Sequence, residues 1–298
     1  MRLVERPSLA RLTTLGLGGT CSAALIVEET ADLARLGREI ETIGLPPYAL
    51  GLGSNILGLD GHHEMLLVRA DLRGEPVLLG EDSSGRTLLS CPAGQPLPSL
   101  LAFCRDRGFA GLEGLAGIPG SVGGAVAMNA GSFGSVIGDR LVSADIWHRG
   151  RVSTFKPARI EMGYRHFLPL GIKKGFWLLT GCVLALDRDE PRAVAERIEA
   201  TRALKKERQP VGARSAGCVF KNPPDGRSAG QLLDAAGFRG RRLGGVEMSS
   251  MHANFLVNTG SGTATEAVEL LKLARAAVAD RFGVELALEV RGVPCRCF

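Results

Sequence analysis

Apolar residues recur along the chain at strand and helix spacings, and these spacings predict alternating elements. An apolar run over 23–27 predicts a strand, and apolar residues at helical spacing between 33 and 40 predict a helix that Gly44 can end. A second apolar run over 48–50 predicts another strand, which breaks into the glycine loop GLGSNIL at 51–57. The opening part of the chain therefore has the order strand, helix, strand and glycine loop with which a βαβ arrangement begins.

The same spacings continue to the C-terminal region. They predict strands over 65–70, 76–80, 87–91, 141–150, 151–156, 177–186 and 286–290, and helices over 97–108, from Pro191 toward Pro210, and from the capping box Thr263–Glu266 onward. We see no internal repeat or low-complexity tract in the sequence. We expect an α+β or mixed α/β chain with a separate C-terminal unit from about residue 201.

The composition is typical of a soluble globular protein. Hydrophobic residues make up 45% of the 298 residues and charged residues 22%, which argues against the disordered and membrane classes. The net charge of +5 comes without a basic stripe and aromatic residues are only 5%, so we expect no nucleic-acid partner. Because the sequence has no signal-peptide pattern and no run of about eighteen apolar residues, we expect a cytoplasmic protein with no membrane partner.

The seven cysteines are spread widely along a chain that is too long to depend on disulfide bonds, so we expect reduced thiols. Only Cys295 and Cys297 lie close together in the sequence. A single C-x-C pair with no second ligand pair is weak support for zinc, and an incidental surface tail is the simpler interpretation. We therefore expect no metal site.

Two glycine-rich segments are candidates for binding a phosphate-containing ligand, and the first is GLGSNIL. Gly51 and Gly53 permit a tight turn there, while Ser54 and Asn55 add side-chain donors beside backbone N–H groups. The loop does not match the dinucleotide fingerprint, because Ile56 occupies the third glycine position, and the chain has no P-loop. A plain turn is an equally good interpretation of this loop by itself.

The second segment, 111–134, is the part of the chain richest in glycine. Its glycines at 117, 120, 123 and 124 surround Ile118 and Pro119, and a backbone with few side chains can present successive N–H groups to a pyrophosphate. The apolar flanks could hold the remainder of a large cofactor. The structural alternative is a glycine-rich packing corner.

Cys218 has the least ordinary surroundings of the cysteines. It lies among small residues in SAGCVFKNP, and Asn222 follows four positions later. The alternative is a small buried hydrophobe, which is the usual role of a cysteine. Arg165 and Glu289 look like ordinary surface residues by themselves, and sequence spacing does not bring them together.

Taken in order, the motifs of this chain resemble those of the UDP-N-acetylenolpyruvoylglucosamine reductase family over nearly its whole length. They are TTLGLGG (13–19), GLGSNIL (51–57), GIPGSVGGAVAMNAG (117–131), YR (164–165), SAGCVFKNP (215–223), SAGQLLDAAGFRG (228–240), HANFLVN (252–258) and LALEV (286–290). The resemblance implies reduction of the enolpyruvyl ether of UDP-N-acetylglucosamine to UDP-N-acetylmuramic acid with FAD and NADPH, in the cytoplasmic stage of bacterial peptidoglycan synthesis.

The resemblance also implies a fold and a division into domains. We expect an α+β protein with a two-lobed FAD-binding domain of the vanillyl-alcohol-oxidase type over 1–200, its lobes covering about 1–70 and 71–200. A smaller α+β substrate-binding domain would follow over 201–298. We expect a monomer whose partners are its small-molecule substrates, UDP-N-acetylglucosamine enolpyruvate and NADPH.

The resemblance assigns roles to residues by position. Arg165, Cys218 and Glu289 match the three catalytic positions, and Asn222 and His252 match positions that contact the UDP-sugar. The FAD loops match at Gly51, Gly53, Ser54, Asn55, Gly117, Ile118, Pro119, Gly120, Ser121, Gly123, Gly124 and Ala125. In the implied mechanism, Arg165 and a protonated or water-linked Glu289 stabilise the charge that develops on the substrate carboxylate, and Cys218 donates a proton to the adjacent carbon.

Two positions depart from the usual pattern of the family. Cys218 stands where most members have serine as the proton donor, and a thiol, being a stronger acid than an alcohol, can still deliver a proton at neutral pH. Phe167 stands where a serine usually follows Tyr-Arg. The compact segment between Arg165 and Cys218 implies the shorter subclass of the family.

Three other functions fit parts of the sequence. Another FAD-dependent oxidoreductase of the same fold could act on a different substrate, because fold does not determine function. A cysteine-nucleophile enzyme would need a histidine base beside Cys218, and nothing in the sequence assigns that role to His166 or His252. A non-catalytic nucleotide-binding protein would have no need for the three catalytic positions.

Overall fold

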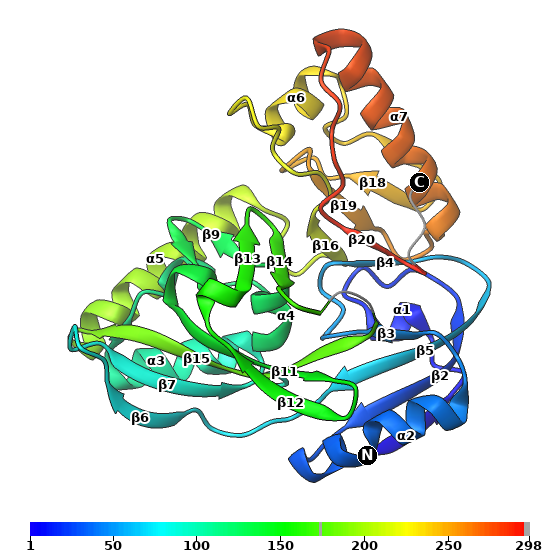
Figure 1. Ribbon diagram of the computed structural model, residues 1–298. Helices are drawn as coiled ribbons and strands as arrows, with labels where there is room; N and C mark the ends of the chain where they lie inside the picture. Colours follow the sequence, from blue (N-terminus) through cyan, green and yellow to red (C-terminus); the bar gives the residue numbers. More distant parts are fainter. Residues whose placement is uncertain (173–174, 295–298) are drawn as a thin grey trace. The chain divides into compact units, whose positions relative to one another are not determined.

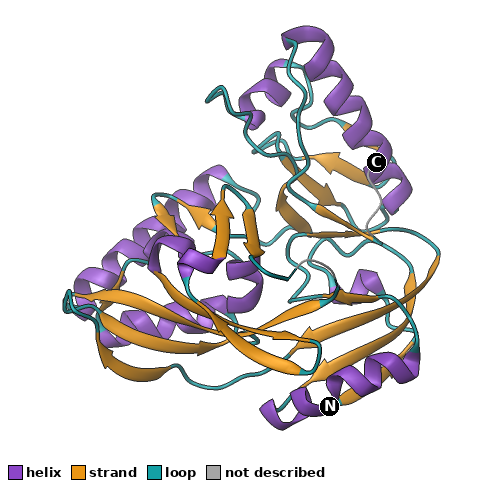
Figure 2. Cartoon of the chain, in the orientation of Figure 1, coloured by secondary structure: helices purple, strands orange, loops and turns teal. Residues whose placement is uncertain are grey.

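The computed structural model describes residues 1–172 and 175–294, which form α-helices, short 3₁₀ helices and strands (Figure 2). The helices are α1 (Leu9–Leu12), α2 (Leu33–Ile43), α3 (Leu97–Arg107), α4 (Val122–Ala127), α5 (Pro191–Arg208), α6 (Ala229–Ala235) and α7 (Ala264–Phe282). The strands up to the central hairpin are β1 (Arg2–Glu5), β2 (Thr20–Val27), β3 (Pro47–Ala49), β4 (Ile56–Gly58), β5 (His62–Ala70), β6 (Val77–Glu81), β7 (Thr87–Pro92), β8 (Phe109–Ala110), β9 (Gly131–Ser132), β10 (Ser135–Val136), β11 (Leu141–His148) and β12 (Arg151–Phe155). The later strands are β13 (Ile160–Gly163), β14 (His166–Pro169), β15 (Trp177–Arg188), β16 (Ser215–Cys218), β17 (Arg242–Leu243), β18 (Val246–Met248), β19 (Phe255–Asn258) and β20 (Arg291–Val293).

The chain forms two compact units, each built from separate stretches of sequence. The first unit comprises Met1–Glu5, Ala23–Leu52 and Met65–Leu204. The second unit comprises Arg6–Ser22, Gly53–Glu64 and the described part of the chain from Lys205 onward. These units do not coincide with a division at residue 200, because two N-terminal stretches belong to the second unit. The assignment of a cofactor domain over 1–200 and a substrate domain over 201–298 stays a prediction.

The N-terminal part of the first unit pairs a small sheet with helix α2. The strands of the sheet follow the order β1-β2-β5-β3, with β1 antiparallel to β2 and β3 parallel to β5. Helix α2 ends at Gly44, whose φ of 69° is the left-handed conformation that glycine adopts without strain. Leu33 and Leu36 of α2 are buried with apolar residues of β2 and β5, which is the burial that the helical spacing predicts.

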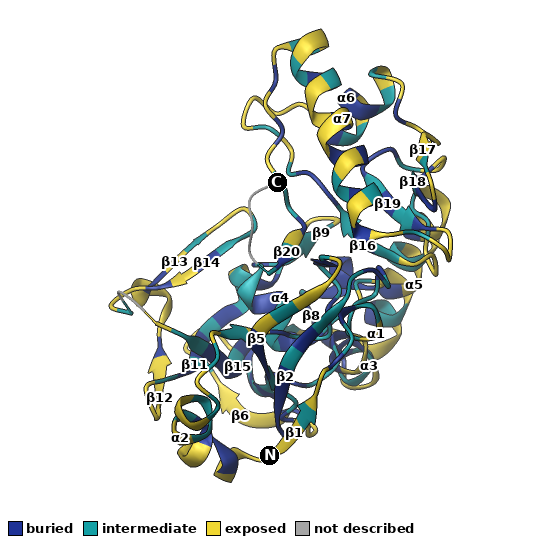
Figure 3. Cartoon of the chain, turned by 90° about the vertical axis from the view of Figure 1, so that its right-hand side faces the viewer, coloured by how far each residue is buried: buried dark blue, intermediate teal, exposed yellow. Residues whose placement is uncertain are grey.

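The larger sheet of the first unit carries its main core. Its strands follow the order β12-β11-β15-β7-β6, and β8 pairs with the end of β15 (Figure 1). The apolar run of β15 is buried because this strand lies inside the sheet, between β11 and β7. The outer strand β6 is exposed along its length (Figure 3). Buried residues of α3 and α4 complete the core.

The second unit is built on a four-stranded antiparallel sheet and two helices. The strands follow the order β16-β19-β18-β17, and α7 packs against β17, β18 and α6. Helix α7 begins with the predicted capping box, in which Thr263 accepts from the N–H of Glu266 and the Glu266 side chain accepts from the N–H of Thr263. Leu15, Leu17 and Leu57 share the core of these elements, which explains why their stretches belong to this unit.

One predicted strand was wrong. Within the described structure, residues 286–290 take part in a single isolated bridge, between Leu288 and Phe220. Backbone hydrogen bonds join Lys221 to Ala287 and Glu289 to Val219, so the apolar alternation there reflects packing beside 219–221 without a continuous ladder. The strand begins three residues later, where β20 pairs in parallel with β4. Within the described residues, no helix is long and apolar enough to cross a membrane.

Candidate active site

The GLGSNIL loop is held by the N-terminal stretch of the second unit. Gly53 has a φ of 71°, and a side chain on it would collide with the backbone of Leu12 and Thr13. The N–H of Thr14 donates to the carbonyl of Gly53 over 3.2 Å. This close approach explains why the loop needs glycine at position 53.

The two glycine-rich segments meet within the first unit. A Cβ built on Gly51 would lie 3.2 Å from the Ser121 hydroxyl and 3.8 Å from the Cα of Gly124. A Cβ on Gly123 would lie 2.8 Å from the Cβ of Ala93. The absence of side chains at these glycines therefore lets the backbones approach each other, as both the ligand and the packing interpretations require.

The second loop offers donors that suit an anionic group. Gly117 and Gly120 have φ values of 82° and 129°, and Ser121 caps α4 by accepting from the N–H of Gly124 over 3.2 Å. Within residues 1–172 and 175–294, the N–H groups of Gly120 and Ser121 donate to no protein acceptor. Free backbone donors beside a side-chain-poor surface fit the pyrophosphate of FAD.

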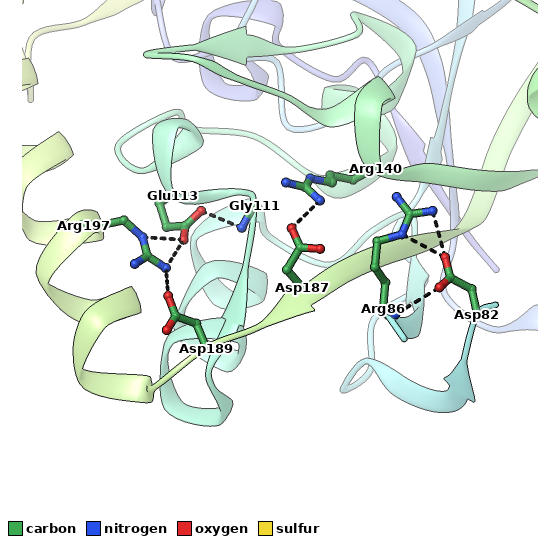
Figure 4. A network of polar contacts seen from close by, with 8 residues as sticks. All are labelled: Asp82, Arg86, Gly111, Glu113, Arg140, Asp187, Asp189 and Arg197. Carbon is green, nitrogen blue, oxygen red and sulfur yellow. Dashed lines mark hydrogen bonds and ion pairs between the residues drawn. The ribbon is translucent and has the colours of Figure 1, made fainter. Parts of the chain in front are cut away.

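A group of ion pairs fixes the stretch that leads into this loop (Figure 4). Glu113 accepts from the N–H of Gly111 over 2.6 Å and from Arg197 over 2.9 Å, and Arg197 also pairs with Asp189 over 2.7 Å. The guanidinium of Arg140 packs against Gly111, where a Cβ would lie 2.5 Å from the Nε of that arginine. Gly111, Glu113, Arg140 and Arg197 line a cavity of about 390 Å³.

Arg165 is held in a tight turn of the first unit. It is the second residue of the two-residue loop between β13 and β14, and its φ of 53° is rare for a residue with a side chain. Its guanidinium donates to the carbonyl of Gly131 over 2.8 Å and lies 5.0 Å from the centre of the Tyr164 ring. Asn129 fastens the same hairpin by donating to the carbonyl of Gly163 over 2.8 Å. The strained backbone and these contacts orient the arginine before any ligand binds.

The structure brings Cys218 and Glu289 together on neighbouring segments of the second unit. The half-buried Cys218 ends β16, and the carbonyl of the next residue, Val219, accepts from the N–H of Glu289 over 2.8 Å. The side-chain amide of Asn55 donates to the carbonyl of Glu289 over 3.0 Å, so the glycine loop supports this segment. Arg165 belongs to the first unit.

The two predicted substrate residues lie around the start of α6. The Asn222 side chain accepts from the N–H of Ala229 over 3.0 Å. The His252 ring packs against Gly230, where a Cβ would lie 2.9 Å from the ring, and its Nδ1 accepts from the N–H of Asn254. Burial lowers the pKa of His252, so the ring is favoured in its neutral form, with Nε2 as a hydrogen-bond donor.

Phe167 is a core residue. It is buried on β14 within the main core of the first unit, and its ring centre lies 5.9 Å from that of Trp177. A serine at this position could not fill the same volume. The departure from the family pattern is therefore accommodated by packing.

Several buried side chains that support the site were not singled out from the sequence. Asn254 accepts from the N–H of Phe220 and donates to its carbonyl, and Asn258 donates to the carbonyls of Leu15 and Gly16. Both lie in the HANFLVN motif, so the signal available was the motif itself. Nothing in the sequence separates such a supporting asparagine from one that contacts a ligand.

The cysteines contribute no metal centre to the described part of the chain. Cys21, Cys91, Cys104 and Cys182 are buried free thiols, and burial raises the pKa of Cys21 to about 11. Among the described residues, no three histidine, cysteine or acidic side chains lie close enough to hold a metal ion. Cys295 and Cys297 lie outside the described residues.

Family models match two parts of the chain. The model of the FAD binding domain matches residues 21–151, and the model of the UDP-N-acetylenolpyruvoylglucosamine reductase C-terminal domain matches residues 209–293. Together they span most of the chain in the predicted order. The expected order, an FAD-binding domain followed by a C-terminal domain of the reductase family, is confirmed by these matches.

Full-length relatives agree with these matches. The UDP-N-acetylenolpyruvoylglucosamine reductase of Nitratidesulfovibrio vulgaris is 45% identical over 98% of each chain, and that of Oleidesulfovibrio alaskensis is 43% identical over 97% of each. The crystal structure of the reductase from Thermus caldophilus is 36% identical, with a TM-score of 0.80 over 98% of this chain and 99% of that one.

Proposed function

Because the chain belongs to the UDP-N-acetylenolpyruvoylglucosamine reductase family and is an FAD-dependent oxidoreductase, we propose that it reduces the enolpyruvyl ether of UDP-N-acetylglucosamine with NADPH. The product is UDP-N-acetylmuramic acid, a precursor of peptidoglycan. The single observation that carries this proposal is the full-length identity of 45% to a curated reductase. Bound FAD supplies hydride transfer from NADPH to the substrate.

We place the cofactor on the two glycine-rich loops. The first loop contributes Gly51, Gly53, Ser54 and Asn55, and the second contributes the backbone of 117–125. The free N–H groups of Gly120 and Ser121 support this placement, because they can donate to phosphate oxygens. The Asn55 side-chain nitrogen is bound to the carbonyl of Glu289, so Asn55 also links this loop to a catalytic segment.

Arg165 stabilises the charge that develops on the substrate carboxylate. Hydride reaches the vinyl carbon distal to that carboxylate, and the electron pair of the double bond moves toward the carboxylate. A guanidinium held by Gly131 and by its turn is a fixed, permanently charged donor. Glu289 assists as a protonated donor or through a water molecule, since an ionised carboxylate would repel the same charge.

Cys218 completes the reaction by donating its proton to the carbon adjacent to the carboxylate. The substrate thus gains a hydride and a proton, and the thiolate recovers its proton from solvent. The half-buried position of Cys218 next to the Glu289 segment supports this role.

Asn222 and His252, which flank the start of α6, bind the UDP-sugar. We propose that the enzyme acts as a monomer in the cytoplasm.

The proposal is tested by following the two half-reactions separately without oxygen. NADPH should bleach the yellow flavin, and UDP-N-acetylglucosamine enolpyruvate should then restore its colour. Bleaching that only oxygen reverses would leave an FAD oxidoreductase with another substrate. A colourless protein that FAD cannot reconstitute would contradict the whole proposal.

The role of Cys218 is tested by substitution. Cys218→Ala should keep FAD and its reduction by NADPH, while substrate reduction falls by about 10² to 10⁴. Cys218→Ser should remain active. Where the wild type loses activity at alkaline pH because its thiol gives up its proton, the serine variant should keep its activity. Normal turnover in the alanine variant would remove Cys218 from the mechanism.

A further inference from the structure

We propose that Thr14 is a positioning residue that ties strand β16, which ends at Cys218, to the GLGSNIL loop. The inference rests on the proposed function, in which Cys218 is the proton donor and the loop binds FAD. Thr14 lies in the TTLGLGG motif and is not among the residues assigned to FAD, to the UDP-sugar or to catalysis. Its backbone N–H and its hydroxyl point to two different segments of the second unit.

The hydrogen bonds of Thr14 join these segments directly. The backbone N–H of Thr14 donates to the carbonyl of Gly53 over 3.2 Å, and the hydroxyl donates to the carbonyl of Ser215 over 2.6 Å. Ser215 is the first residue of β16, and Cys218 is its last. One residue therefore connects the centre of the candidate cofactor loop to the strand that ends in the candidate proton donor.

Strand β16 needs such a support because its own pairing is irregular. It pairs with β19 only at Ser215 and Cys218, and the register shifts between these two positions. Gly217, which lies in the shift, has a φ of 78° and donates its N–H to the Ser215 hydroxyl over 3.1 Å. A strand with a bulge of this kind can change its path without breaking a regular ladder.

The residues that follow Cys218 are held by hydrogen bonds to Asn254. Asn254 binds both the N–H and the carbonyl of Phe220, and the N–H of Val219 donates to the carbonyl of Asn254. At the upstream end, β16 is joined to β19 where Ser215 pairs with Val257 and where the N–H of Asn258 donates to the carbonyl of Arg214. The Thr14 hydroxyl holds the upstream end at Ser215.

The expected consequence separates the two half-reactions. Flavin reduction by NADPH does not use Cys218, whereas protonation of the substrate requires its thiol at the reacting carbon. A misplacement of about 1 Å can cost roughly a hundredfold in rate. Loss of the Thr14 hydroxyl should therefore slow the second half-reaction and spare the first.

The test uses the full-length, FAD-loaded enzyme and three variants. Thr14→Val removes the hydroxyl at constant shape, and Thr14→Ser keeps it. Thr13→Val is the matched control, because the Thr13 hydroxyl donates to the carbonyl of Leu9 over 2.9 Å, within its own helical turn. If Thr14→Val does not fold, Thr14→Ala takes its place.

We expect Thr14→Val to slow flavin reoxidation by the enolpyruvyl sugar about tenfold or more, with FAD affinity and reduction by NADPH within about twofold of the wild type. Thr14→Ser should recover the wild-type rate, and Thr13→Val should match it. An equal loss in both half-reactions, or a loss of FAD, would show a merely structural role. Wild-type rates in Thr14→Val would overturn the proposal.

A second measurement reports on Cys218 without using the reaction. Alkylation by iodoacetamide, followed by mass spectrometry of the tryptic peptide 215–221, gives the reactivity of this thiol alone. In Thr14→Val it should change by about threefold or more, and in Thr13→Val it should not. An unchanged rate would overturn the positioning role. If the wild type fails to reduce the enolpyruvyl sugar, the proposed function fails, while the alkylation rates still decide the role of Thr14.

Discussion

At the scale of single residues, the candidate site depends on backbone positions that a side chain would block. Gly53 lies against Leu12 and Thr13, and Gly123 lies against Ala93. Arg165 adopts a positive φ in spite of its side chain, and its contact with Gly131 compensates for that strain. The shape of the candidate site therefore depends on backbone conformations and close approaches that most side chains would prevent.

Gly53→Ala should destabilise the protein by about 3 kcal/mol or more, because the added methyl group meets backbone atoms that have no freedom to move and the positive φ disfavours alanine. The loss should appear in chemical denaturation together with weaker FAD binding. Gly37→Ala is the matched control. Gly37 lies inside helix α2, and its added methyl group would lie 3.6 Å from the Trp147 ring, an ordinary contact distance. Because alanine favours a helix interior over glycine, the free energy of unfolding should rise by about 0.5 to 1 kcal/mol. An equal change in the free energy of unfolding in both variants would contradict the requirement for glycine at position 53.

At the scale of elements, helix α7 shows how local signals and a distant residue combine at one helix end. The spacing of Thr263 and Glu266 in the sequence predicts the capping box that the structure shows. Asp60, from another stretch of the second unit, accepts from the N–H groups of Ala264 and Thr265 and from the Thr265 hydroxyl. Two carboxylates thus satisfy the first turn, and the helix macrodipole favours both.

Hydrogen bonds from the N–H groups of Thr263 and Gly245 lower the pKa of Glu266 below its ordinary value of 4.5. The unfolded chain then binds this proton more readily, so the stabilisation is present above pH 4.5 and is lost as the pH falls toward the folded-state pKa. Glu266→Gln should lower Tm at pH 7 by about 2 °C, and the difference from the wild type should shrink in acid. Glu269→Gln, on an exposed position of α7, should leave Tm unchanged at both pH values. A constant deficit at all pH values would contradict the role of the charge.

At the scale of the whole molecule, the two compact units are interleaved in sequence. The core of the second unit contains Leu15, Leu17 and Leu57 beside residues that follow position 215. Asn258 reaches Leu15 and Gly16, and β4 supplies the partner strand of β20. The second unit therefore needs N-terminal stretches to complete its core.

A fragment of residues 205–298 should not fold cooperatively, since it would expose the apolar surface that Leu15, Leu17 and Leu57 cover and would leave β20 without its partner. Thermal unfolding followed by near-ultraviolet circular dichroism should show no sharp transition. The control is the full chain measured in the same buffer. A cooperative transition in the fragment would show that the C-terminal part is an independent domain.

Local patterns determined most elements of this fold. The helix that ends at Gly44, the capping box of α7 and the hairpin of β11 and β12 follow from spacing, glycine and side-chain caps, which act within a few residues. The glycine content of the two loops marked them as candidates for binding a phosphate-containing ligand, and their binding of FAD stays a prediction. The family resemblance, carried by ordered motifs, indicated the reaction.

Contacts between distant residues were decided only by the tertiary structure. Residues 286–290, predicted as a strand, form no continuous ladder with 219–221 in the described structure, because the N–H of Lys221 donates to Ala287 and the carbonyl of Val219 accepts from Glu289 around a single bridge. The placement of the Glu289 segment beside Cys218, the support of that segment by Asn55 and the tie from Thr14 to Ser215 join residues far apart in sequence. A local pattern reports the conformation of a segment and which of its faces is buried. Which distant backbone group satisfies a given donor is settled only when the whole chain packs.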